Sequence, residues 1–203
     1  MVTSLKPLCY AVRYSTHARL HPMKIVLATP LYPPDIAPPA PYAKELAKRL
    51  ADRHEVVVVA YGRLPERVEG VRIAAVDKRR PLPLRLVQYF FALRSAAKNA
   101  DVLYIQNGPS VELPAGLLAY LTGIPLVMHI ADLSAHRHAE SSFWLSRIER
   151  FALRRAQATL TDSPLPRPEI LPFEPRPTEA LAAYEASWVA HLQKLEDALN
   201  HAR

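Results

Sequence analysis

The 203-residue chain is long enough to form a domain with a sizeable core, because half of its residues are hydrophobic. Its net charge of +7 indicates either a solvated basic surface or an anionic partner, such as a nucleotide diphosphate or acidic lipid headgroups. The sequence contains no basic stripe interleaved with aromatic residues, so no nucleic-acid partner is expected. The single cysteine, Cys9, excludes an internal disulfide and favours a reducing, cytoplasmic compartment.

The first segment, residues 1–22, holds three basic residues and no acidic residue. Its apolar stretch is too short for the core of a signal peptide. Met23 stands directly before the first apolar run. We therefore predict that residues 1–22 are a leader that is disordered or not translated.

The most informative part of the chain is a βαβ pattern that begins after this leader. The apolar run Lys24–Thr29 predicts a strand, Pro39–Arg53 has helical spacing of apolar residues, and the valine-rich run Glu55–Tyr61 predicts a buried strand. In a parallel sheet, ligands bind beyond the carboxyl ends of the strands. The connecting loop Pro30–Pro41 should therefore face a site.

The alternation of strands and helices continues along the chain. Further strands are predicted at Val71–Val76, Val102–Gln106, Pro125–Ile130 and Ala158–Thr161, and helices at Leu84–Ala100, Val111–Leu121 and Phe143–Arg155. The polar segment Ala131–Ser142 is predicted to be a loop. Six strands alternating with helices predict an α/β domain with a doubly wound parallel sheet over residues 23–163.

The carboxyl-terminal part divides into two segments. Residues 164–177 contain six prolines and predict a linker, because proline cannot continue the interior of a sheet. Thr178 is a suitable helix cap for a long helix over Ala180–Ala202. We expect residues 178–203 to form a helix that packs back on the domain.

Several motifs in order resemble the amino-terminal domain of family 4 glycosyltransferases, which have the two-domain GT-B architecture. They comprise Tyr32-Pro33-Pro34-Asp35-Ile36, Glu45-Leu46-Ala47-Lys48-Arg49-Leu50, His54-Glu55-Val56, Gly123-Ile124-Pro125-Leu126-Val127 with His129 and Asp132, Ala156–Ser163 and Pro168–Phe173. The resemblance covers about residues 23–173. It implies a Rossmann-like single domain equivalent to the amino-terminal half of a GT-B glycosyltransferase, with an added carboxyl-terminal helix.

The resemblance also implies an activity. Family 4 enzymes transfer a sugar from a nucleotide-sugar donor to an acceptor hydroxyl, with the acceptor mainly on the amino-terminal domain and the nucleotide mainly on the carboxyl-terminal domain. No two glutamates here are eight residues apart, so the Glu-X7-Glu donor motif is absent from the sequence. We expect an acceptor-side domain that is inactive without a donor-binding subunit. The alternatives are a non-catalytic binding module and a fragment of a degraded gene.

Candidate site residues follow the strands. His129 is the candidate catalytic residue, and Asp35, Asn107, Ser110 and Asp132 are candidate substrate-binding residues. The two loop glycines of the family fall at Ala37 and Pro38, which predicts a degenerate phosphate loop, because proline has no N–H to donate.

No cofactor or metal is expected, since His136 and His138 have no third ligand nearby in the sequence and suit a solvated loop. The segments Leu84–Ala100 and Phe143–Arg155 combine apolar faces with basic flanks. Core packing explains the apolar faces, and contact with an anionic membrane is the second interpretation. The protein is accordingly expected in the cytoplasm, either free or peripheral to the inner face of the membrane.

Overall fold

The computed structural model describes residues 22–37, 39–161, 169–170 and 181–203. Its strands are β1 (Lys24–Thr29), β2 (Glu55–Tyr61), β3 (Val71–Val76), β4 (Val102–Gln106), β5 (Leu126–Ile130), β6 (Ala156–Thr161) and β7 (Glu169–Ile170). Its helices are α1 (Pro39–Ala51), α2 (Leu82–Ala96), α3 (Pro109–Thr122), α4 (Leu133–Ser141), α5 (Phe143–Arg155) and α6 (Leu181–Ala202).

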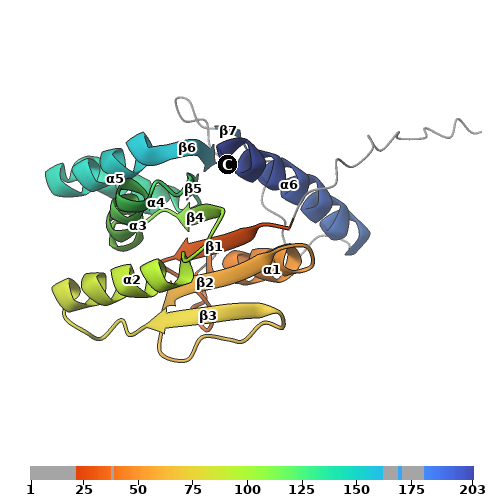
Figure 1. Cartoon of the computed structure of the whole chain (residues 1–203), viewed down its shortest axis with the longest axis horizontal. Coiled ribbons are helices and arrows are strands. Elements are labelled where there is room, and N and C mark those ends of the chain that lie inside the picture. Colours follow the sequence, from red (N-terminus) through yellow and green to blue (C-terminus); the bar gives the residue numbers. More distant parts are fainter. Residues whose placement is uncertain (1–21, 38, 162–168, 171–180) are drawn as a thin grey trace, which may run out of the picture.

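The strands form one parallel sheet in the order β3-β2-β1-β4-β5-β6-β7, with helices on both faces (Figure 1). The strand order reverses its direction between β1 and β4. Such a switch point opens a crevice at the carboxyl ends of the two strands. The predicted doubly wound, Rossmann-like α/β fold is confirmed.

Alternating side chains of the buried strands divide the core into two layers. In β1, Ile25 and Leu27 pack with α1 and α6, whereas Val26 and Ala28 pack with α2, α3 and α5. This is why the central strands are apolar on both faces. The final helix joins the first layer through Trp188 and Leu195, which are both buried.

The segment Ala131–Ser142 was predicted to be a loop, and this prediction is wrong, because most of it forms α4. The side chain of Asp132 caps the helix by accepting hydrogen bonds from the backbone N–H groups of Ser134 and Ala135. A short polar helix gives little apolar periodicity. Its cap and its contacts with α5, rather than an apolar stripe, hold it in place.

Other differences lie at the ends of elements. Helix α2 begins at Leu82 and ends at Ala96, both earlier than predicted. Strand β6 begins at Ala156 rather than Ala158, next to an irregularity in its pairing with β5, where the Gln157 side chain accepts a hydrogen bond from Leu126 N–H. Two residues of the Pro-rich segment, Glu169 and Ile170, form β7 beside β6. Residues 1–21, Pro38 and the helix cap proposed at Thr178 lie outside the described residues.

Candidate functional site

A cavity of about 230 Å³ lies at the carboxyl edge of the sheet. Its walls come from the loops after β1, β4 and β5 and from the first residues of α3. They include Pro30, Gln106, Asn107, Ser110 and Asp132. We call this cavity the edge pocket. It lies where the sequence predicted a site, at the switch point of the sheet.

The close approach of two loops shapes one wall of the edge pocket. Gly108 has a φ of 151°, and a Cβ added there would lie 3.1 Å from the Pro30 side chain. The position therefore favours glycine, both for its backbone angle and for the space available. Gly108 also ends the β4 loop and directly precedes α3.

Gln106 is the most deeply buried polar residue of the edge pocket. One end of its side-chain amide is hydrogen-bonded to Thr29 Oγ1 at 2.6 Å, which ties the end of β4 to the end of β1. The other end of the amide is buried and has no hydrogen-bond partner among the described residues. A buried amide group without a partner is costly, so Gln106, which lines the pocket, is a candidate for contact with a ligand.

Asn107 and Asp132 lie side by side in the edge pocket, as expected from the ends of neighbouring strands. The Asn107 side chain uses both its amide N–H and its carbonyl on the backbone of Asp132. The Asp132 carboxylate is the cap of α4. Partial burial alone would raise the pKa of this carboxyl, but hydrogen bonds from the Ser134 side chain and from the N–H groups of Ala135 and Ser134 outweigh burial and lower it.

His129, the candidate catalytic residue, is not part of the lining of the edge pocket. Its ring lies in the core layer of α1 and α6, with Nδ1 2.6 Å from Tyr104 Oη and an edge contact with Tyr42 at 5.6 Å between centroids. Burial, followed by the influence of His191, lowers the pKa of His129 to about 3. A base that is this weak is poorly suited to taking a proton at neutral pH.

Of the remaining predicted residues, the lining of the edge pocket includes Ser110 but not Asp35 or Ala37. Asp35 forms an ion pair with Lys78 from the loop after β3. Ser110 lines the edge pocket, and its backbone carbonyl accepts a hydrogen bond from Tyr61 Oη at 2.9 Å. The carbonyl of Ala37 accepts a hydrogen bond from Ala40 N–H at the start of α1, and Pro38 lies outside the described residues.

Two buried carboxylates, Glu112 and Glu149, were not found from the sequence, and the prediction that His136 lies in a solvated loop is wrong, because this side chain is buried on α4. Glu112 on α3 accepts a hydrogen bond from Gly108 N–H at 2.8 Å. Burial raises its pKa to about 7 against the lowering effect of that bond, and the Glu149 charge adds to the rise. His136 on α4 and Glu149 on α5 form a buried pair, with Nδ1 and Oε1 2.6 Å apart.

A signal for Glu112 was present in the sequence, because it is the one charged residue in the otherwise apolar segment Pro109–Thr122. No spacing rule joins His136 to Glu149, which come from two different helices. Among the described residues, no group of three or more His, Cys, Asp or Glu side chains could hold a metal ion.

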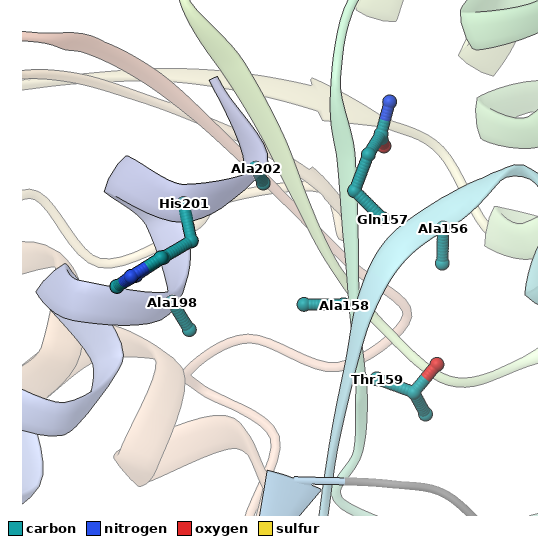
Figure 2. Close-up of a pocket in the computed structure, with 7 residues that line it drawn as sticks. All are labelled: Ala156, Gln157, Ala158, Thr159, Ala198, His201 and Ala202. Carbon is teal, nitrogen blue, oxygen red and sulfur yellow. The ribbon is translucent and has the colours of Figure 1, made fainter.

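A second cavity, of about 350 Å³, lies between β6 and α6 (Figure 2). Figure 2 shows the small side chains of Ala158 and Ala198 on its two sides. The His201 Nδ1 atom lies 2.6 Å from the Asp197 carbonyl of its own helix. Its polar side chains are those of Gln157, Thr159 and His201. The edge pocket is the stronger candidate for a site of chemistry because it lies at the switch point of the sheet.

With the geometry known, comparison with known proteins identifies the class. Residues 39–183 match the family described as glycosyl transferase 4-like domain, and the chain belongs to this family. The resemblance found in the sequence is thereby confirmed. No curated protein sequence matches the chain.

Solved structures support the fold. The Anabaena protein Alr3699/HepE, solved in complex with UDP, is 18% identical with a TM-score of 0.50, and the match covers 84% of this chain and 40% of that one. A Listeria monocytogenes protein described as a UDP-N-acetylglucosamine 2-epimerase is 15% identical with a TM-score of 0.50, over 70% of this chain and 40% of that one.

The carboxyl-terminal domain of the coenzyme A biosynthesis bifunctional protein CoaBC is 12% identical with a TM-score of 0.50, over 91% of this chain and 100% of that domain. The chain thus spans about 40% of the length of the first two proteins and the whole of the CoaBC carboxyl-terminal domain. Within the described part of the chain, no helix has both the length and the apolar character to cross a membrane.

Proposed function

We propose that this domain binds the acceptor of a glycosyl transfer reaction in the edge pocket, while a separate domain or subunit binds the nucleotide-sugar donor. The observation that carries the proposal is the edge pocket itself, which lies at the switch point of a glycosyl transferase 4-like domain and is lined by Gln106, a residue with one buried amide atom that has no partner among the described residues. The donor is a co-substrate, and no other cofactor is needed.

The chemistry of the edge pocket suits a sugar. Sugar hydroxyls both donate and accept hydrogen bonds, and the lining combines the side-chain amide of Gln106 with the hydroxyl of Ser110. Pro30 and Leu31 supply apolar surface of the kind that packs on the faces of small ligands. This mixture of a few polar groups with apolar walls supports an uncharged, hydroxylated acceptor.

The same edge is poorly equipped for the diphosphate of a donor. Phosphate is held by backbone N–H groups, often from glycine-rich turns, and here Ala37 stands where the family has a glycine. The Anabaena HepE structure contains UDP, and this chain matches 40% of that protein. Together with the resemblance to family 4 enzymes, this supports a donor site on a second domain. A chain lacking that domain would not turn over a donor.

The test uses ligand-observed NMR on the purified chain with a panel of mono- and disaccharides and with UDP-sugars. We expect saturation transfer to particular sugars, with no extra contact from the uridine. Gln106→Met should abolish the transfer, because it removes the amide at nearly constant side-chain volume. Gln193→Met, the same change at an exposed position on α6, is the matched control. Hydrolysis or transfer of a UDP-sugar by the chain alone would contradict the proposal.

A second candidate function, a non-catalytic sugar-binding module, is favoured by His129. Its buried ring lies outside the edge-pocket lining and has a pKa of about 3, so the domain lacks the expected base. The two candidates differ in one result. A binding module binds sugar and remains inactive when a donor domain from a family 4 enzyme is supplied, whereas an acceptor-side domain gains transferase activity.

A further inference from the structure

Helices α2, α3 and α5 form one layer on the sheet, with α3 between the other two (Figure 1). Helix α2 contains no acidic residue, and the acidic residues of α3 and α5, Glu112 and Glu149, are both buried. The outer surface of these three helices therefore exposes no carboxylate. It exposes arginines instead: Arg94, Arg147, Arg150, Arg154 and Arg155.

The same surface exposes large apolar side chains. On α2, Leu84, Val87 and Phe91 follow one another at helical spacing, and Phe91 is 62% exposed. At the start of α5, Phe143 and Trp144 are 62% and 73% exposed. We call the exposed arginines and apolar residues of α2 and α5 the basic face.

The opposite layer is different. Next to α1 and α6, two arginines are paired with carboxylates: Arg49 pairs with Glu45 and Glu185, and Arg53 pairs with Glu196. The exposed arginines of the basic face, in contrast, have no exposed carboxylate on α2, α3 or α5. A solvated basic surface does not need exposed aromatic rings among its arginines.

We propose that the basic face docks on the surface of a bilayer that contains anionic phospholipid. Arginines attract the lipid phosphates, and the Phe143 and Trp144 rings enter the headgroup region, where aromatic side chains are favoured. Nucleic acid shares the phosphate, but it offers no apolar layer for Phe91, Val87 and Leu84. A lipid surface can bind both the arginines and the apolar side chains of the basic face.

The first experiment measures flotation of the full chain with vesicles of phosphatidylcholine, with or without phosphatidylglycerol. We expect binding only to the anionic vesicles, weakened by salt. Because each basic residue near an anionic surface contributes roughly fivefold to partitioning, Arg150→Gln with Arg154→Gln should reduce it about 25-fold. Lys48→Gln with Arg67→Gln, which removes two charges elsewhere, should change it little. No binding, or equal loss in both double variants, would overturn the proposal.

The second experiment tests whether the rings insert. Trp188 is buried, so Trp144 is the exposed tryptophan and its emission should shift to shorter wavelength on anionic vesicles. Trp144→Phe should remove the shift and keep the circular dichroism of the folded domain. A shift that persists in this variant would overturn the proposal. So would binding of duplex DNA more tightly than anionic vesicles, or self-association that buries Trp144 in the absence of lipid. Sugar binding in the edge pocket is measured separately, so either proposal can fail alone.

Discussion

The side chain of Asn107 holds the backbone of Asp132 by two hydrogen bonds. Asn107 Nδ2 donates to the Asp132 carbonyl at 2.7 Å, and Asp132 N–H donates to Asn107 Oδ1 at 2.8 Å. Asn107 directly follows β4, and Asp132 follows β5 and caps α4. This one amide therefore joins two strand ends and fixes the position of a helix at the rim of the edge pocket.

Replacing Asn107 with alanine should destabilise the protein and loosen that rim. The change leaves the Asp132 N–H without its partner and removes one of the two hydrogen bonds that the Asp132 carbonyl accepts, the other coming from His136 N–H, so the free energy of unfolding should fall by about 2 kcal/mol. Urea denaturation measures the loss. Gln193→Ala, which removes an exposed amide from α6, should stay within about 0.5 kcal/mol of the unaltered chain. If both variants behave alike, the two hydrogen bonds contribute no stability.

Glu112 should make the protein less stable as the pH rises towards neutrality. Burial raises the pKa of this carboxyl from 4.5 to about 7, so the folded state keeps its proton where the unfolded state has lost it. The contribution is fully present below pH 4.5, falls between pH 4.5 and about 7, and is lost above. The fall amounts to about 3 kcal/mol.

The measurement for Glu112 is the free energy of unfolding of the Glu112→Gln variant subtracted from that of the unaltered chain, from pH 4 to pH 8. Glutamine keeps an oxygen to accept the hydrogen bond from Gly108 N–H and does not titrate. Glu69→Gln, which removes a carboxyl at an exposed position before β3, is the control variant. A flat difference for Glu112→Gln would show that this carboxyl titrates normally.

The elements that were predicted from the sequence are those with a strong apolar pattern. The valine run of β2 and the strand Val102–Gln106 are buried on both faces, and their bounds agree with the prediction. Helix α4 was missed because its stability comes from the cap at Asp132 and from the pair of His136 with Glu149, which a local pattern does not contain.

The residues of the candidate site also fall into those that the sequence predicted and those that it did not. Asn107, Ser110 and Asp132 were predicted from their places after strands, and the structure brings them together in the edge pocket. Gln106 was not singled out, since a glutamine at the end of an apolar strand gives no signal of its own. His129 shows that a position at the end of a strand does not by itself place a side chain in the pocket. The alternation of side chains in β5 directs its ring into the core layer of Tyr42, which the sequence could not place without α6.

Above about pH 4, His129 should remain uncharged as long as the protein is folded. Burial and His191 lower its pKa from 6.5 to about 3. Because the unfolded chain takes up a proton first, the contribution of His129 to stability is fully present above pH 6.5 and falls as the pH drops towards 3. The check is an NMR titration of the imidazole resonances, assigned by their absence in His129→Gln. A ring that titrates near its ordinary value would contradict the burial of this side chain.

Trp188 should be required for α6 to stay packed on the domain. It is 1% exposed, stacks on Tyr42 at 5.7 Å between centroids, and has the Arg49 guanidinium 4.9 Å from its own ring. Trp188→Ala removes the ring contacts with Tyr42 and Arg49 of α1 and should cost about 4 kcal/mol. Trp188→Phe, which keeps a ring, should cost less than half as much.

Hydrogen exchange along Leu181–Ala202 should rise in the alanine variant before the sheet exchanges. Val189→Ala, at the exposed neighbouring position, is the control. If the alanine variant keeps the exchange protection of α6, polar pairs such as Arg49 with Glu185 hold the helix without the indole.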